Sequence, residues 1–236
     1  MPLRRLLARS AVAALLWLGA AMPASAAVTI TFWSHEGGGM FPHAFISLRG
    51  RPDAGGPPVD LNVGFTARHI TPAILFGSVP GMLDAADRSY LSSSDAHFSL
   101  QLSDAQYAEV LQVIDGWGPH GDQRYNLNKR NCVTFAKVIA ERLGLAGTDQ
   151  PTLMKKPHSF MEAVEAANTG RVVPVEQHGD VYIAALQPVP GIDPKLPLLA
   201  ATSPVDPASA VAKTAPAAPP PATGITAQSM STSAAR

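Results

Sequence analysis

The sequence predicts an α+β fold in which a small antiparallel sheet packs with helices. Segments typical of strands come first along the chain and segments typical of helices follow them, so that the two kinds fall in separate blocks. Alternating apolar and polar residues at 59–65 and 96–102 mark two of the strands. This separation favours α+β over an alternating α/β sheet.

Three strands are expected near the start of the domain. Residues 28–33 are rich in β-branched and aromatic side chains, and residues 43–48 and 59–65 follow as the second and third strands. Turn-forming residues separate the second strand from the third, so we expect these two strands to form an antiparallel hairpin with a long loop. Pro and Gly interrupt residues 66–95, which we expect to be irregular with short turns.

Helices dominate the second half of the predicted domain. Ser103 caps a helix over 104–117, and a second helix over 131–143 ends at Gly144. Both helices carry apolar residues at helical spacing on one face. The remaining expected elements are a strand at 96–102, a short helix at 159–168, and two late edge strands at 172–175 and 181–183.

The two ends of the chain are predicted to lie outside this fold. Residues 1–26 combine a basic start, an apolar run and a small-x-small ending, which is the pattern of a cleaved secretory signal peptide. An uncleaved anchor is the competing interpretation of that segment. Residues 191–236 are dominated by Ala, Pro, Ser and Thr and predict a disordered tail. One domain over 27–190 remains.

The signal predicts an exported protein, either periplasmic or secreted, with no stable membrane span after cleavage. Removing it takes three arginines and no acid from a chain with 18 basic and 18 acidic residues, so the mature chain is mildly acidic. Phosphate binding needs a basic surface, and this charge balance therefore argues against nucleic acid as a partner.

The chain holds one cysteine, Cys132, at the predicted start of the helix over 131–143. Unpaired backbone N–H groups and the helix dipole favour a thiolate there, so we expect the pKa of the thiol to be lowered. The same N–H groups could receive the oxyanion of an acyl-transfer intermediate. A buried structural thiol and an intermolecular disulfide are the competing interpretations of this residue.

A tyrosine, Tyr125, lies seven residues before the cysteine, and Asn131-Cys132-x-Thr134-Phe135 opens the helix. This pattern resembles the cysteine motif of the permuted papain-like hydrolases, which include NlpC-like cell-wall peptidases and relatives of lecithin:retinol acyltransferase. The resemblance covers about residues 28–145, with the motif specific and the rest loose. It implies a circularly permuted papain-like (NlpC-like) core in the predicted domain.

In that group the catalytic histidine precedes the cysteine on a strand of a small antiparallel sheet, and His43 matches this position. The resemblance implies that Cys132 forms an acyl-thioester while His43 acts as base and then protonates the leaving group. A third residue should orient the imidazole. Asn62 is the first choice because an antiparallel hairpin sets the end of strand three beside the start of strand two, and Asp60 or His35 are alternatives.

Two further residues are candidates for supporting roles. Tyr125 either offers its hydroxyl to the oxyanion or substrate, or packs against the start of the helix. Asn131 is expected to bond to backbone at that start, in a capping role. The seven histidines show no metal-binding spacing and a single cysteine does not make a structural zinc site, so no metal or cofactor is expected.

The leading hypothesis is an exported thiol-dependent amidase or peptidase acting on a peptide or acyl substrate. Peptidoglycan stem peptides are the first substrate guess, because they are the obvious amides of that compartment. A lipid acyl hydrolase or acyltransferase is the first alternative. A non-enzymatic envelope-binding module that keeps the fold is the second alternative.

Overall fold

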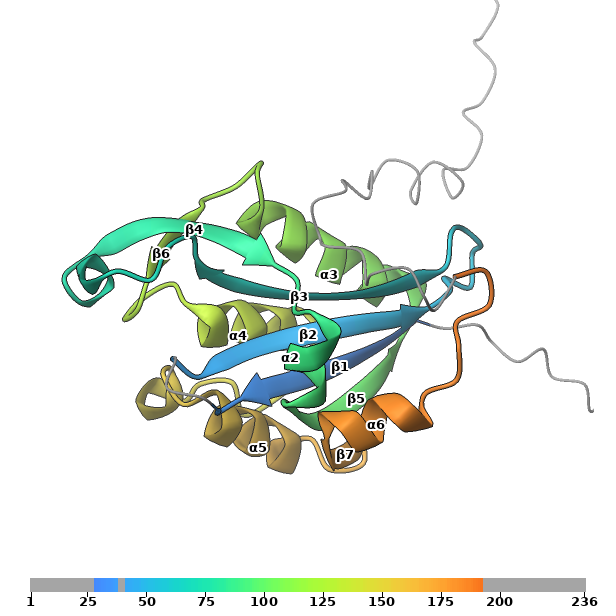
Figure 1. The fold of residues 1–236 in the computed structure, drawn as a ribbon. Coiled ribbons are helices and arrows are strands. Elements are labelled where there is room, and N and C mark those ends of the chain that lie inside the picture. Colours follow the sequence, from blue (N-terminus) through green and yellow to red (C-terminus); the bar gives the residue numbers. More distant parts are fainter. Residues whose placement is uncertain (1–27, 38–40, 193–236) are drawn as a thin grey trace, which may run out of the picture.

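The computed structural model describes residues 28–37 and 41–192. The predicted signal peptide, residues 1–26, lies outside the described residues, and so does nearly all of the predicted tail over 191–236. The described part is α+β, as predicted, with an antiparallel sheet and several helices. Figure 1 shows the sheet running across the molecule with helices on both of its faces.

The sheet has seven strands in the order β6-β4-β3-β2-β1-β5-β7, and every neighbouring pair is antiparallel. The predicted hairpin of the second and third strands is confirmed as β2–β3. Strands β1 and β2 lie in the middle of the sheet, and each pairs with a neighbouring strand on both of its edges. Side chains at the ends of these two strands are therefore carried by a rigid base. The strands are β1 (Val28–His35), β2 (His43–Gly50), β3 (Val59–Ala67), β4 (Ser78–Asp84), β5 (Asp95–Leu102), β6 (Arg124–Asn126) and β7 (Val173–His178).

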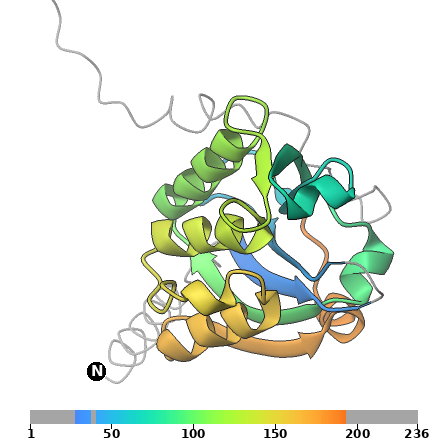
Figure 2. The same cartoon turned by 90° about the vertical axis from the view of Figure 1, so that its left-hand side faces the viewer.

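The helices form two layers. Helices α3, α4 and α5 cover one face of the sheet, as Figure 2 shows, and the shorter α2 and α6 lie against the other face. The sheet is thus the middle layer of three. The helices are α2 (Arg88–Ser92), α3 (Asp104–Trp117), α4 (Cys132–Arg142), α5 (Pro157–Ala167) and α6 (Gly179–Ala185), with short 3-10 turns η1 (Pro72–Leu75) and η2 (Pro151–Leu153).

Each face of the sheet buries its own apolar core. The larger core lies under α3, α4 and α5, where Ile46 of β2 and Phe135 of α4 are completely buried. The smaller core lies under α2 and α6, where Trp33 of β1 stacks on Phe45 of β2. Burying one large apolar side chain is worth roughly 1.5–3 kcal/mol, so these two cores fix β1 and β2 from both sides.

Residues 66–95 are more regular than the sequence predicts, since they contain β4 and α2. Strand β4 carries Pro80 and Gly81, which argue against a strand on local grounds. It divides its pairing between two partners, because Ser78–Pro80 pair with β6 and Gly81–Asp84 pair with β3. The missing N–H of Pro80 is therefore tolerated at the point where the pairing changes over.

The predicted edge strand at 181–183 is wrong, because these residues form part of helix α6. Asp180 accepts a hydrogen bond from the backbone N–H of Val181 within the first turn. Tyr182 and Ile183 pack on the core around Trp33, and the Tyr182 hydroxyl lies 3.0 Å from Thr31 Oγ1. Tertiary packing of this kind overrides the β propensity of the segment.

Candidate active site

Cys132 is the first residue of helix α4, and a network around Asn131 fixes that point. The Asn131 side chain accepts from the backbone N–H of Thr134, while Thr134 Oγ1 accepts from the backbone N–H of Asn131. The Asn131 amide also donates to the carbonyls of Leu127, at 2.9 Å, and Met154, at 2.7 Å. The start of the helix is thereby tied to the loops on either side of it, and the thiol has a fixed position.

The thiol of Cys132 lies against the backbone on both sides of His43. Its sulfur is 3.9 Å from the Pro42 carbonyl oxygen, and the backbone N–H of Ala44 points at it. The ladder between β2 and β3 begins one pair further in, at Phe45↔Gly64. Cys132 thus lies where this ladder ends, beside the strand position that carries His43.

The His43 ring lies over Gly64 of the neighbouring strand β3. A Cβ atom at position 64 would overlap Nε2 of His43 and lie 3.0 Å from Cβ of Phe45. The ring also stacks on Phe45, with centroids 6.0 Å apart, and meets the ring of Tyr90 edge-on at 6.4 Å. A glycine at position 64 is therefore what leaves room for the imidazole in this orientation.

The Cys132 thiol and the His43 imidazole are both uncharged at neutral pH. Burial raises the pKa of the Cys132 thiol to about 11, and burial followed by the nearby His35 lowers the pKa of His43 to about 4. The expectation that the helix N-terminus lowers the pKa of the thiol is wrong. Backbone N–H groups of Ala44 and Val133 do favour the thiolate, but loss of water around a side chain only 5% exposed has the larger effect.

Asn62 and Asp60, two of the candidates for the third residue, form hydrogen bonds with groups other than His43. Asn62 is opposite Ser47, well along the strand from His43, and its side-chain amide exchanges two hydrogen bonds with the backbone of Ala86. Asp60 forms a two-pronged ion pair with Arg49. The strand face was predicted correctly, but the register places Gly64 under the imidazole, so neither residue orients His43.

His35 is the candidate that the structure brings beside His43. The two residues are register partners on β1 and β2, and His35 acts on the pKa of His43. The His35 ring stacks on Tyr90, with centroids 4.1 Å apart, and its Nδ1 lies 3.2 Å from Ser94 Oγ. His35 is therefore held in place by α2 and the residues that follow it.

Two tyrosines, Tyr90 and Tyr125, lie near enough to Cys132 for its charge to act on the pKa values of their hydroxyls. Burial, and then the nearby Cys132, raise the pKa of Tyr90 to about 12, and the same two causes raise the pKa of Tyr125. Both hydroxyls stay protonated at neutral pH and can donate hydrogen bonds to negative charge that develops near the sulfur. Tyr125 was predicted as a candidate, whereas Tyr90 was missed. The N-cap Asp87, which accepts from the backbone N–H of Tyr90, is the signal that could have revealed α2.

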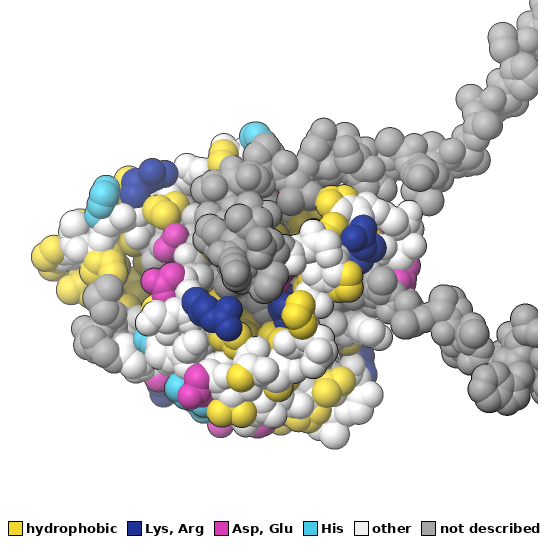
Figure 3. All heavy atoms as spheres, turned by 45° about the vertical axis from the view of Figure 1, so that its right-hand side comes forward, with side chains coloured by type: hydrophobic (Ala, Val, Ile, Leu, Met, Phe, Trp, Pro, Cys, Tyr) yellow, Lys and Arg dark blue, Asp and Glu magenta, His cyan; other side chains and the backbone are white. Residues whose placement is uncertain are grey.

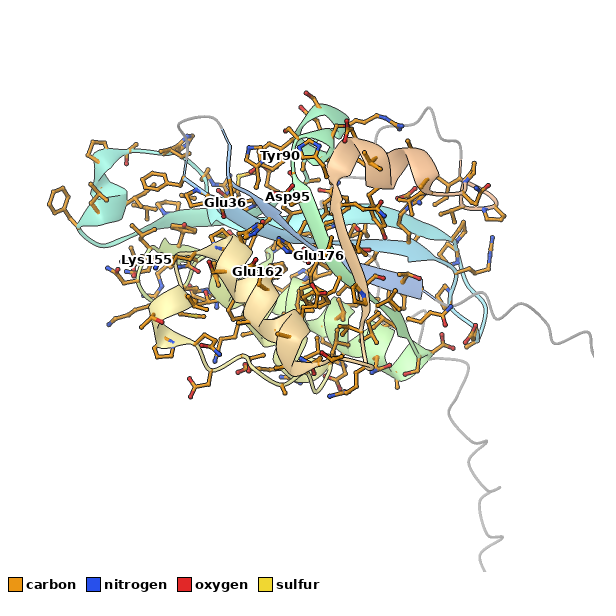
Figure 4. All side chains as sticks on the ribbon, turned by 90° about the horizontal axis from the view of Figure 1, so that it is seen from below. Glu36, Tyr90, Asp95, Lys155, Glu162 and Glu176 are labelled. Atoms are coloured by element: carbon orange, nitrogen blue, oxygen red, sulfur yellow. The ribbon has the colours of Figure 1, made fainter. Side chains whose placement is uncertain are left out.

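A cavity of about 520 Å³ is lined in part by Pro42, whose carbonyl oxygen lies 3.9 Å from the Cys132 sulfur. It is bounded by the residue before His43, by the segment after β1, by the start of β5 and by the start of α5. Figure 4 shows Glu36 and Asp95 near the sheet strands, and Lys155 on the far side of Glu36 from Asp95. The residues that line this cavity are Glu36, Pro42, Asp95, Lys155, Lys156, His158 and Ser159.

Within residues 28–37 and 41–192, no three His, Cys, Asp or Glu side chains gather closely enough to hold a metal ion. In the same residues, none of the helices has the length and apolar character needed to cross a bilayer. Figure 3 shows one face of the molecule, on which basic and acidic side chains are scattered and do not form a large patch of one charge.

The chain matches no protein-family model, and no significant match was found among curated proteins or among solved structures. The likeness to permuted papain-like hydrolases therefore rests on the residues around Cys132 and on the order of histidine and cysteine along the chain.

Proposed function

We propose that this protein is an exported thiol hydrolase that cleaves an amide through an acyl-thioester on Cys132, with His43 as base. The observation that carries the proposal is the position of the sulfur between the Pro42 carbonyl and the Ala44 N–H, directly beside the strand position of His43. A cysteine at the start of a capped helix, next to a histidine on an antiparallel strand, is also what a circularly permuted papain-like core would contain.

The proposed reaction starts from a neutral thiol and a neutral imidazole. His43 accepts the thiol proton as the sulfur attacks the substrate carbonyl, and the carbonyl oxygen becomes an oxyanion facing the tyrosine hydroxyls and the N–H groups at the start of α4. The C–N bond then breaks, and His43 gives its proton to the leaving amine. Water attacks the thioester with His43 again as base, which releases the acid and returns the proton to the sulfur.

The first substrate to test is peptidoglycan, because its stem peptides are the amides an exported hydrolase meets. Purified sacculi are incubated with the protein, and soluble peptides with new amino termini are measured by mass spectrometry. We expect product from the unmodified protein, a loss of at least about a thousandfold in Cys132→Ala, and a loss of about a hundredfold or more in His43→Gln.

The matched control for this assay is His120→Gln, since His120 is an exposed histidine bonded to Asp115. Its product release should equal that of the unmodified protein. Equal release by Cys132→Ala and the unmodified protein would overturn the proposal. The binding-module alternative gains support if sacculi are retained by the protein without any release of peptides.

A lipid acyl hydrolase is the second candidate, and one surface feature favours it. The turn between β3 and β4 exposes large apolar side chains, with Ile70 50%, Leu75 58% and Phe76 87% exposed. Since β3 ends where β2 begins, this apolar tip extends from the same end of the sheet as His43. Apolar side chains gather at that end of the molecule in Figure 3. Release of fatty acid from phospholipid vesicles, absent in Cys132→Ala, would favour this candidate over the amidase.

A further inference from the structure

The cavity lined by Glu36, Pro42 and Lys155 has charged walls and adjoins the backbone that faces the Cys132 thiol. Pro42 lines the cavity and its carbonyl oxygen is 3.9 Å from the Cys132 sulfur. Glu36 lines it as well, and its charge contributes to the raised pKa of the thiol. A group that fills this cavity is therefore within reach of an amide carbonyl presented to the sulfur.

The cavity carries charges of both signs at different places. On one side, Glu36 accepts a hydrogen bond from the backbone N–H of His158 at 3.2 Å, and Asp95 lies 4.0 Å from His158 Nδ1. On the other side, Lys155 and Lys156 come directly before α5. Neither lysine forms an ion pair with a residue in the described part of the chain. Within that part of the chain, the two ammonium groups have no anionic partner.

We infer that this cavity binds a zwitterionic group, the free ammonium and carboxylate of an amino acid, beside the scissile amide. The lysines would contact the carboxylate, while Glu36 and Asp95 would contact the ammonium. This inference rests on the proposed function, and it narrows the substrate class from amides in general to amides of a residue with a free amino-acid end. A neutral acyl chain would leave the two lysines without a counterpart and would gain no favourable charge contact from the four charged groups.

The inference is tested by the selectivity of Cys132 toward bromoacetamides of equal chain length. Nε-bromoacetyl-lysine ends in an ammonium and a carboxylate, N-bromoacetyl-cadaverine in an ammonium, 6-(bromoacetamido)hexanoate in a carboxylate, and N-pentyl-bromoacetamide in a methyl group. In each case the sulfur displaces bromide, and mass spectrometry follows the modified chain. We expect the zwitterionic reagent to react roughly tenfold faster than the neutral one, since each partly exposed charge contact is weak.

Two variants assign this selectivity to the cavity. The double variant Lys155→Gln/Lys156→Gln should lose the advantage given by the carboxylate, and Glu36→Gln should reduce the advantage given by the ammonium. Gln at position 36 keeps an acceptor for the N–H of His158. Lys137→Gln is the control, because Lys137 forms its ion pair with Glu141 on α4. Ratios between reagents are compared, so that any change in the pKa of the thiol cancels.

An equal rate for the zwitterionic and neutral reagents would overturn the inference. So would a ratio that both cavity variants leave unchanged, or a carboxylate reagent that reacts as fast as the zwitterion. None of these results touches the role of His43, which is tested by replacing that residue. Failure of the cavity assignment and failure of the proposed function are therefore distinguishable.

Discussion

At the scale of single residues, Gly64 decides where the His43 ring can lie. The imidazole occupies the space that a side chain at position 64 would fill, and Phe45 closes the same space from the side. A glycine within a strand often marks a close approach of another group, and here that group is the candidate base. The geometry of the site therefore depends on a residue that takes no part in the chemistry.

We predict that Gly64→Ala displaces His43 and destabilises the fold. The added methyl overlaps Nε2 of His43, and overpacking of this kind costs about 1–3 kcal/mol of unfolding free energy. Product release from the preferred substrate should fall by about tenfold or more, because small misplacements of a base are costly. Chemical denaturation and the release assay check the two effects. Unchanged stability together with unchanged release would show that the ring does not need this space.

At the scale of elements, the start of α4 is held more firmly than an ordinary helix start. Asn131 satisfies the backbone N–H of Thr134 and also ties the helix to Leu127 and Met154. Helix α3 begins with a comparable capping box at Ser103, which lies in an exposed position. The two caps have similar local geometry, and only one of them adjoins the thiol.

This pair of caps gives a matched prediction. Ser103→Ala should lower the unfolding free energy by about 0.5–2 kcal/mol, as the loss of a capping side chain does, and Asn131→Ala should lower it by more, because it also removes the hydrogen bonds to Leu127 and Met154. Only Asn131→Ala should also change the iodoacetamide reaction rate of Cys132, because only that cap positions the sulfur. Denaturation and alkylation rates are measured for both variants. Equal alkylation rates in the two variants would contradict a positioning role for Asn131.

At the scale of the whole molecule, acidic side chains of helix α5 face an acidic side chain of the edge strand β7. Figure 4 shows Glu162 of α5 close to Glu176 of β7. Burial, followed by the neighbouring Glu176 and then Glu162, raises the pKa of Glu165 from its ordinary 4.5 to about 7. The folded protein therefore binds more protons than the unfolded chain between about pH 4.5 and 7.

The sign of the resulting pH dependence follows from that difference. Because the folded state holds the extra proton, the stability should fall as pH rises from about 4.5 through about 7. Glu165→Gln removes this dependence, so the variant should melt at a higher temperature than the unmodified protein at pH 8 and at a similar temperature at pH 5. Glu109→Gln, which removes an exposed partner of Arg142, is the control. A melting difference that is the same at both pH values would refute the assignment.

The fold class and the central hairpin could be predicted from sequence, because they follow from local pattern. Residues 59–65 and 43–48 carried enough strand signal to place β3 beside β2, and the residues around Cys132 indicated a helix start. Strand β4 was hidden by Pro80 and Gly81, because its pairing depends on β3 and β6, which local pattern does not show. Helix α2, which carries Tyr90, was missed although its N-cap Asp87 is a local signal.

The electrostatics of the site could not be predicted, because burial is a tertiary property. The helix start at Cys132 suggested a lowered pKa, and the surrounding protein reverses that direction. The first choice for the third residue, Asn62, was misplaced for a similar reason. Period-two alternation placed Asn62 on the correct face, but only the observed register shows that it lies opposite Ser47.

The most direct test of a nucleophile–base pair at Cys132 and His43 is the pH dependence of Cys132 alkylation by iodoacetamide, in the unmodified protein and in His43→Gln. A buried thiol with a pKa of about 11 should react faster as pH rises from 7 toward 10, rather than at a constant rate. At pH 7.5 the variant should react at least about tenfold more slowly, because its thiol has lost the neighbouring base. Identical profiles for the two proteins would contradict the pairing.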